Sequence, residues 1–122
     1  MSRNIFIGVD GGGGSTECII ADEKGRFLGK GLSGGTNIYS SGESKMAEAL
    51  LESMVSAGYN RDDKVIAACF GMSGVIHGLE NTAVKKIVKD ILPTTEKIIV
   101  VCDAISTLTG SIGLGAGICI NA

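Results

Sequence analysis

The sequence has no excess of positive charge and no long apolar run. Its formal net charge is −2 over 122 residues, so it offers no broad basic surface for nucleic acid or an anionic membrane. No apolar stretch reaches the roughly 20 residues that a membrane-spanning helix requires. Residues 1–4 lead straight into a strand-like segment without a signal-peptide pattern. We therefore expect a cytoplasmic globular domain that binds neither nucleic acid nor membrane.

The sequence also lacks paired cysteines. Its four cysteines are far apart, and each lies in an apolar, strand-like run. No CxxC pair is present that could form half of a zinc or iron–sulfur site. We expect free thiols in a reducing compartment rather than disulfides or metal ligands. The cysteines are Cys18, Cys69, Cys102 and Cys119.

Glycine, by contrast, is abundant. The chain has 19 glycines, well above the usual share of about 7%. They fall in separate clusters between apolar runs rather than in one low-complexity tract. This pattern indicates several places where the backbone turns sharply or approaches a ligand closely.

Alternating apolar runs and turn residues predict three strands joined by tight turns, followed by alternating helices and strands. A capping box of Ser40 and Glu43 would start the first helix and Gly58 would stop it, while Pro93 would end the second helix. The predicted strands are residues 5–9, 17–21, 27–32, 65–70 and 97–102, and the predicted helices are residues 40–57, 81–92 and 104–109, with a closing strand at 118–120.

These elements follow the order βββαβαβα before the closing strand. Strands that arrive after a helix can lie parallel to the first strand, so we expect a mixed five-stranded sheet in an α/β domain of the ribonuclease-H-like class. In open α/β sheets, ligands gather beyond the carboxyl ends of the parallel strands. By that rule Asp10, residues 71–74 and Asp103 should converge on one edge of the sheet.

The turn between the first two strands has the chemistry of an anion site. Four consecutive glycines expose backbone N–H groups with no Cβ in the way, and two hydroxyl residues follow them. Asp10 would repel a polyphosphate unless a divalent cation lay between them, and a carboxylate with Mg²⁺ beside phosphate oxygens is usual in nucleotide chemistry. A mobile glycine-rich hairpin without a ligand is the alternative. The predicted phosphate-binding residues are Gly11, Gly12, Gly13, Gly14, Ser15 and Thr16, and Asp10 is the predicted metal ligand.

The turn sequence Val-Asp-Gly-Gly-Gly-Gly-Ser-Thr, residues 9–16, resembles the first phosphate motif of the actin-like, hexokinase and heat-shock ATPase superfamily. Within that superfamily the chain looks like the N-acetylglucosamine kinase family, which is related to the activator ATPases of 2-hydroxyacyl-CoA dehydratases. The resemblance covers essentially the whole chain. It implies that the chain is the N-terminal half of a two-domain, actin-like kinase that transfers phosphate from ATP to an amino sugar or a related hexose.

The resemblance also implies roles for residues outside the turn. It places sugar recognition at Asn37, whose amide can donate and accept hydrogen bonds, and a sugar-lining turn at Ser73 and Gly74. It makes Asp103 a sugar-contacting general base that accepts the proton of the attacking hydroxyl. Each has a structural alternative: a turn residue for Asn37, a plain strand-to-helix turn for residues 71–74, and a helix N-cap for Asp103.

The chain departs from the family pattern in two places. The family usually has threonine directly after its glycines, about where Gly14 stands, so Ser15 or Thr16 must supply the hydroxyl and the sequence leaves both open. Residues 117–122 resemble the approach to a second phosphate hairpin, which is absent. We therefore expect an N-terminal domain at residues 1–110 and the start of a second domain at 111–122, and we expect the chain to be inactive alone.

Two other functions remain open at this point. An activator-type ATPase would couple hydrolysis to electron transfer through a cysteine-bound iron–sulfur cluster at a dimer interface. A non-catalytic sugar-binding regulator would keep the fold and lose phosphate transfer. The oligomeric state is also open, and a homodimer is one of the assemblies left to test. A small-molecule sugar, ATP and the missing C-terminal domain are the expected partners.

Overall fold

Five strands and two helices make up the part of the chain that the computed structural model describes, which is residues 3–12, 14–35, 38–72 and 79–102. The alternation of elements agrees with the order expected from the sequence. The predicted helix 104–109 and the predicted strand 118–120 lie outside the described residues. The elements are β1 (Asn4–Gly11), β2 (Ser15–Asp22), β3 (Phe27–Gly34), α1 (Ile38–Ser56), β4 (Lys64–Met72), α2 (Leu79–Ile91) and β5 (Lys97–Cys102).

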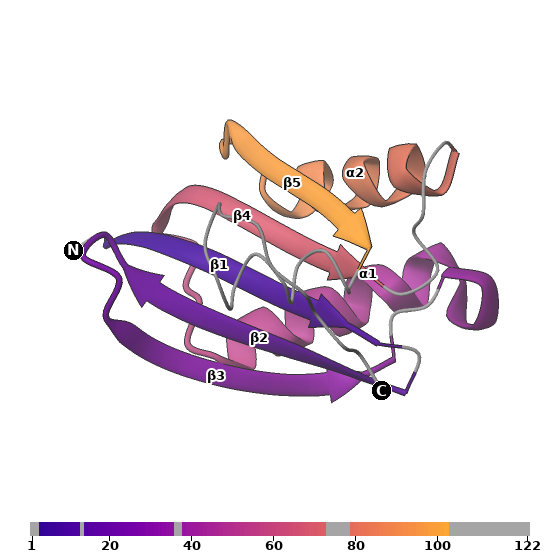
Figure 1. Cartoon of the computed structure of the whole chain (residues 1–122), viewed down its shortest axis with the longest axis horizontal. Helices are drawn as coiled ribbons and strands as arrows, with labels where there is room; N and C mark the ends of the chain where they lie inside the picture. Colours follow the sequence, from indigo (N-terminus) through magenta and orange to yellow (C-terminus); the bar gives the residue numbers. More distant parts are fainter. Residues whose placement is uncertain (1–2, 13, 36–37, 73–78, 103–122) are drawn as a thin grey trace, which may run out of the picture.

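The five strands form one mixed sheet in the order β3-β2-β1-β4-β5. β2 runs antiparallel to both β1 and β3, while β4 runs parallel to β1 and β5 runs parallel to β4. The arrowheads of β1, β3, β4 and β5 therefore point the same way in Figure 1. This arrangement confirms the predicted mixed five-stranded sheet. The edge at which these four strands end is called the carboxyl edge below.

The two faces of the sheet have different environments because successive side chains of a strand point to opposite faces. Along β1, Ile5, Ile7 and Val9 are buried, whereas Phe6 and Asp10 are exposed. The buried side packs against both helices, which lie behind the sheet in Figure 1 and contact each other. Burying a large apolar side chain contributes about 2 kcal/mol. The largest apolar side chains of this core are Ile5, Ile20, Met46, Leu50, Met54, Phe70, Met72, Val84 and Val88.

The opposite face, called the open face below, carries neither of the two described helices. Several large apolar side chains on this face remain partly exposed. It also carries Asp10 and Glu17, which lie directly opposite each other on β1 and β2. Near the carboxyl edge, the described polar side chains of this face thus include Asp10 and Glu17. The exposed large apolar residues of the five strands are Phe6, Ile19, Phe27, Leu28, Leu32 and Ile99.

α1 has glycines at both ends of its main segment. Gly42 has φ 79° and ψ 167°, so a short helical turn before it is separated from the main helix after it. Ser40 lies inside the helical span, so it is not the N-cap that the sequence predicted. Gly58 has φ 106° and donates its N–H to the Val55 carbonyl, while the next residue, Tyr59, donates to Met54. This is a Schellman ending, and it confirms Gly58 as the predicted stop.

Two glycines of β3 allow α1 to lie directly against the strand. A Cβ atom at Gly31 would come within 2.2 Å of the Ser53 carbonyl oxygen, and one at Gly29 would come within 2.0 Å of the Ala57 carbonyl oxygen. Both obstacles are backbone atoms, so no side-chain rotation can relieve the contact. The spacing between β3 and α1 therefore requires glycine at these two positions.

We predict that Gly31→Ala lowers the free energy of unfolding by about 1–3 kcal/mol, because the added methyl group must push α1 away from the sheet. Gly8→Ala is the matched control, since a Cβ at Gly8 meets nothing within 4 Å. Urea denaturation of both variants and the wild type measures the difference. Equal stability of Gly31→Ala and Gly8→Ala would contradict the close packing of α1 on β3.

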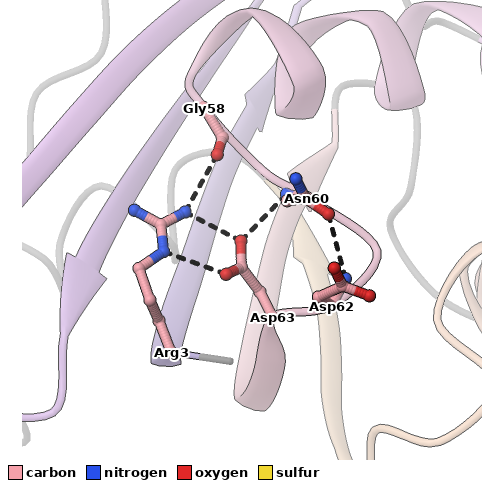
Figure 2. Close-up of polar contacts among 5 residues, drawn as sticks. All are labelled: Arg3, Gly58, Asn60, Asp62 and Asp63. Carbon is pink, nitrogen blue, oxygen red and sulfur yellow. Dashed lines mark hydrogen bonds and ion pairs between the residues drawn. The ribbon is translucent and has the colours of Figure 1, made fainter. Parts of the chain in front are cut away.

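An ion pair joins the starts of β1 and β4 at the end of the sheet away from the carboxyl edge (Figure 2). Arg3 donates from Nε to Asp63 Oδ1 at 2.9 Å and from Nη2 to Asp63 Oδ2 at 2.8 Å. The same Nη2 donates to the Gly58 carbonyl at 2.9 Å, and the Asn60 N–H donates to Asp63 at 2.8 Å. The Asp63 side chain is only 3% exposed. The hydrogen bonds from Arg3 hold the pKa of Asp63 below its usual value, against the opposing effect of burial.

This lowered pKa predicts a pH dependence of stability. Because the folded pKa of Asp63 lies below the unfolded value of about 3.9, its contribution is fully present above that pH and is lost as the pH falls through the folded pKa. Asp63→Asn should therefore be less stable than the wild type at neutral pH, and this difference should shrink in acid. Urea denaturation at several pH values measures the difference in free energy of unfolding between the two proteins. A difference that stays constant down to acid pH would contradict the lowered pKa of Asp63.

Candidate functional site

The glycine-rich turn connects β1 to β2 at the carboxyl edge. Gly11 pairs with Thr16 across the hairpin, so the turn consists of the four residues between them. The Gly12 N–H donates to the Ser15 carbonyl at 2.8 Å and closes the turn. A Cβ at Gly12 would lie 3.0 Å from that same oxygen, so a larger residue would crowd the closing hydrogen bond. Gly13 lies outside the described residues.

Gly14 and Ser15 form the exposed end of this turn. Both residues are exposed, and a Cβ at Gly14 would meet nothing within 4 Å. A side chain at position 14 therefore has open space, in contrast to position 12.

The two hydroxyl residues of the turn face opposite sides of the sheet. Thr16 is completely buried on the side of the helices, where its Oγ1 donates to the Gly34 carbonyl at 2.7 Å. Ser15 is exposed, and it precedes Glu17 by two residues, so it belongs to the same face as Glu17 and its partner Asp10. Of the two candidates that the sequence left open, only Ser15 shares the open face with Asp10.

Asp10 is exposed at the carboxyl edge, next to a second carboxylate. Its cross-strand partner is Glu17, and like charges directly opposite each other destabilise a sheet. Lys30 of β3 partly compensates, with its Nζ 3.4 Å from Glu17 Oε1. Exposed carboxylate oxygens beside a phosphate site are the ligands that Mg²⁺ prefers, so Asp10 fits the predicted metal role in its chemistry. The described residues contain no cluster of three or more potential metal ligands.

The carboxyl edge brings together chain segments that are far apart in the sequence. Asp10 pairs with Gly71, and Met72, the last residue of β4, pairs with Cys102, the last residue of β5. Gly34, the last residue of β3, pairs with Ser15. The connections that follow β3, β4 and β5 therefore all leave the sheet at this edge, which agrees with the predicted convergence. The predicted residues in those connections, Asn37, Ser73, Gly74 and Asp103, lie outside the described residues.

One described cleft lies away from the carboxyl edge. It has a volume of about 810 Å³ and lies between α1 and α2, bordered by Leu51, Tyr59, Asp63 and Pro93. These residues place it toward the amino ends of β4 and β5, away from the glycine turn. We therefore do not assign this cleft to the site.

Two of the four cysteines, Cys18 and Cys69, are free thiols in the structure. Cys18 is buried, and this burial raises the pKa of its thiol to about 12, while Cys69 is half-buried. Both observations agree with the expected unpaired thiols. Of the helices described, neither is long and apolar enough to cross a membrane.

Sequence reasoning missed the polar contacts that organise the turn. The bond from Thr16 to Gly34 joins residues that are 18 positions apart, and the Glu17–Lys30 pair depends on the register of β2 against β3. The burial of β2 alternates, with Thr16 in phase with Cys18 and Ile20. Because residues 18–21 form a continuous apolar run, the sequence alone gave no clear signal that Thr16 is the buried hydroxyl.

Comparison with known proteins adds a family match and several relatives. The sequence profile of the BadF/BadG/BcrA/BcrD ATPase family matches residues 7–116. An N-acetyl-D-glucosamine kinase from Dictyostelium discoideum is 31% identical over an alignment of 119 residues, which covers 89% of this chain and 37% of that protein.

Solved structures show the same fold. A candidate N-acetylglucosamine kinase from Chromobacterium violaceum superimposes with a TM-score of 0.69 at 25% identity, over 95% of this chain and 40% of that one. A candidate N-acetylglucosamine kinase from Porphyromonas gingivalis gives a TM-score of 0.68 at 21% identity, over 81% of this chain and 34% of that one, and supports the fold alone. The chain thus spans a little over a third of the length of the relatives it matches.

Proposed function

Because the chain belongs to the BadF/BadG/BcrA/BcrD ATPase family, we propose that it forms the phosphate-binding half of an ATP-dependent kinase for an amino sugar of the N-acetylglucosamine type. One observation carries the proposal: the glycine turn lies at the carboxyl end of β1, with Asp10 and Ser15 on the same open face of the sheet. The family match supports the use of ATP. The likeness to a Dictyostelium discoideum N-acetyl-D-glucosamine kinase supports the class of sugar.

The phosphate side of the proposed site is the glycine turn. Backbone N–H groups of Gly13 and Gly14 bind phosphate oxygens, and the Ser15 hydroxyl adds a donor from the open face. Gly11, which is buried and paired with β4, begins the turn. Gly12 does not donate to phosphate, because its N–H already donates to the Ser15 carbonyl. Its lack of a side chain allows the backbone to lie close to the phosphate. The hydroxyl that the family has at position 14 is thus supplied one residue later.

The sugar side consists of residues that we place by the resemblance alone. Asn37, Ser73 and Gly74 bind the sugar, and the Asp103 carboxylate takes the proton from its attacking hydroxyl. That oxygen forms a bond to the γ-phosphorus as the bond from this phosphorus to the bridging oxygen breaks, and ADP leaves. Mg²⁺ at Asp10 would supply charge neutralisation between the carboxylate and the phosphates. The strand ends that lead into these connections meet at the carboxyl edge, which supports this placement.

The proposed enzyme is longer than this chain. We place the first domain at residues 1–110 and the beginning of a second domain at 111–122. The matched relatives are more than twice as long as the matched segment, which supports a second domain that would enclose the nucleotide. The chain alone should therefore lack turnover. Its use of ATP also fits a cytoplasmic location.

We predict that the full-length protein phosphorylates N-acetylglucosamine and that Asp103→Asn lowers kcat by about 100-fold or more while keeping the fold. A coupled ADP-release assay with the sugar measures turnover, and circular dichroism of the same preparation checks the fold. Residues 1–122 alone serve as the inactive control. Full turnover in Asp103→Asn would contradict the role of Asp103 as general base.

The same preparation separates the kinase from the two alternatives. An activator-type ATPase would hydrolyse ATP without transferring phosphate to sugar and would contain iron. A non-catalytic regulator would bind sugar without any ATP turnover. Sugar-dependent ADP release and phosphosugar formation, without bound iron, would support the kinase over both.

We predict that Ser15→Ala weakens ATP binding by about tenfold or more, because a hydrogen bond to a charged group contributes about 1.5–3 kcal/mol. Adding Gly14→Thr to this variant should restore binding, since position 14 has room for a side chain. Calorimetric titration of the full-length protein with a non-hydrolysable ATP analogue measures both effects. An unchanged affinity in Ser15→Ala, or no rescue by Gly14→Thr, would contradict the assignment of Ser15.

A further inference from the structure

Thr16 makes the contact by which the glycine turn is tied to the end of β3. Its hydroxyl donates to the Gly34 carbonyl at 2.7 Å, and Thr16 is 0% exposed. Gly34 is also the partner of Ser15 in the pairing of β2 with β3. Gly34 therefore contacts both Thr16 and the residue that faces the proposed phosphate site, Ser15. The buried Thr16 hydroxyl requires a hydrogen-bond partner, because an unsatisfied buried polar group is costly.

The contacts continue from β3 into α1. The Ser33 hydroxyl donates to the Ala49 carbonyl at 2.6 Å. Two positions earlier, Gly31 lies so close to α1 that no Cβ fits between them. The end of β3 is therefore fixed on one side to the glycine turn by Thr16 and on the other side to α1. The connection from β3 to α1 starts from this fixed point.

We propose that Thr16 is a positioning residue that couples the nucleotide and sugar sites. This inference rests on the proposed function, in which the turn binds phosphate and the connection after β3 binds sugar. Because the bond to Gly34 fixes the turn relative to the start of the connection, a ligand that positions the one also positions the other. By thermodynamic linkage, bound sugar then favours nucleotide binding by the same factor. Thr16 acts through Gly34 and touches neither ligand, in contrast to Ser15.

The test measures this coupling in the full-length protein. Calorimetry gives the Kd for a non-hydrolysable ATP analogue with and without saturating N-acetylglucosamine, and the ratio of the two values is the coupling factor. In the wild type we expect a ratio well above one. Thr16→Val keeps the size and removes the hydroxyl, so its ratio should fall close to one. Thr16→Ser keeps the hydroxyl and should keep the ratio.

A matched control separates coupling from stability. Ser53 is also 0% exposed, and its hydroxyl donates to the Leu50 carbonyl at 2.8 Å within α1, away from the carboxyl edge. Ser53→Ala removes a comparable buried hydrogen bond, so it should lower the thermal stability and leave the coupling factor unchanged. If Thr16→Val does not fold, Thr16→Cys, with its weaker thiol donor, should give a ratio between those of the wild type and an uncoupled protein.

The outcomes distinguish this inference from the proposed function. A wild type that phosphorylates the sugar but shows no coupling, or a Thr16→Val variant that keeps the wild-type ratio, would overturn the role of Thr16 alone. A wild type that neither binds nor phosphorylates the sugar would overturn the proposed function and this inference with it. Loss of coupling in Ser53→Ala as well as in Thr16→Val would also overturn it, because a general loss of stability would then account for the result.

Discussion

The alternation of side chains along β2 is the constraint on which the site depends. The pairing of Gly11 with Thr16 places Thr16 in the core and leaves Ser15 on the open face, beside Asp10. A slip of β2 by one residue against β1 would exchange the faces of the two hydroxyls, so that Thr16 rather than Ser15 would share the open face with Asp10. Such a slip is strongly opposed, because it would also expose the apolar side chains that share the buried face with Thr16. The hydrophobic core therefore determines which hydroxyl can reach a ligand.

The second determinant is the fit of α1 against β3. Because Gly29 and Gly31 leave no space for side chains, the helix lies directly on the strand and holds its end in place. Thr16 then connects that end to the glycine turn. The glycine turn, β3 and α1, which are separate in sequence, are thus joined by short contacts. In the proposed kinase, these contacts keep the phosphate-binding turn and the sugar-binding connection after β3 in a fixed position relative to each other.

The sequence predicted the order and type of the described elements, because their apolar periodicity is strong. Strand ends were less predictable: β1 extends to Gly11 and β3 to Gly34, and glycine carries no periodic signal for a strand. The start of α1 was also predicted wrongly. Ser40 is a residue type that favours the N-cap position, but it lies within the helical span. At the site, composition identified the turn, but the choice between its two hydroxyls depended on register and on a contact with β3. Such long-range contacts have no local signature in the chain.

The central claim is that the turn from Gly11 to Ser15 binds the phosphates of ATP. The most direct measurement is an NMR titration of the ¹⁵N-labelled chain with MgATP at millimolar concentration. The account predicts that the amide resonances of Gly14 and Ser15 shift with nucleotide, whereas those of Arg3 and Asp63, at the opposite end of the sheet, do not. An unperturbed turn at saturating MgATP, or shifts centred on the Arg3–Asp63 end, would contradict it.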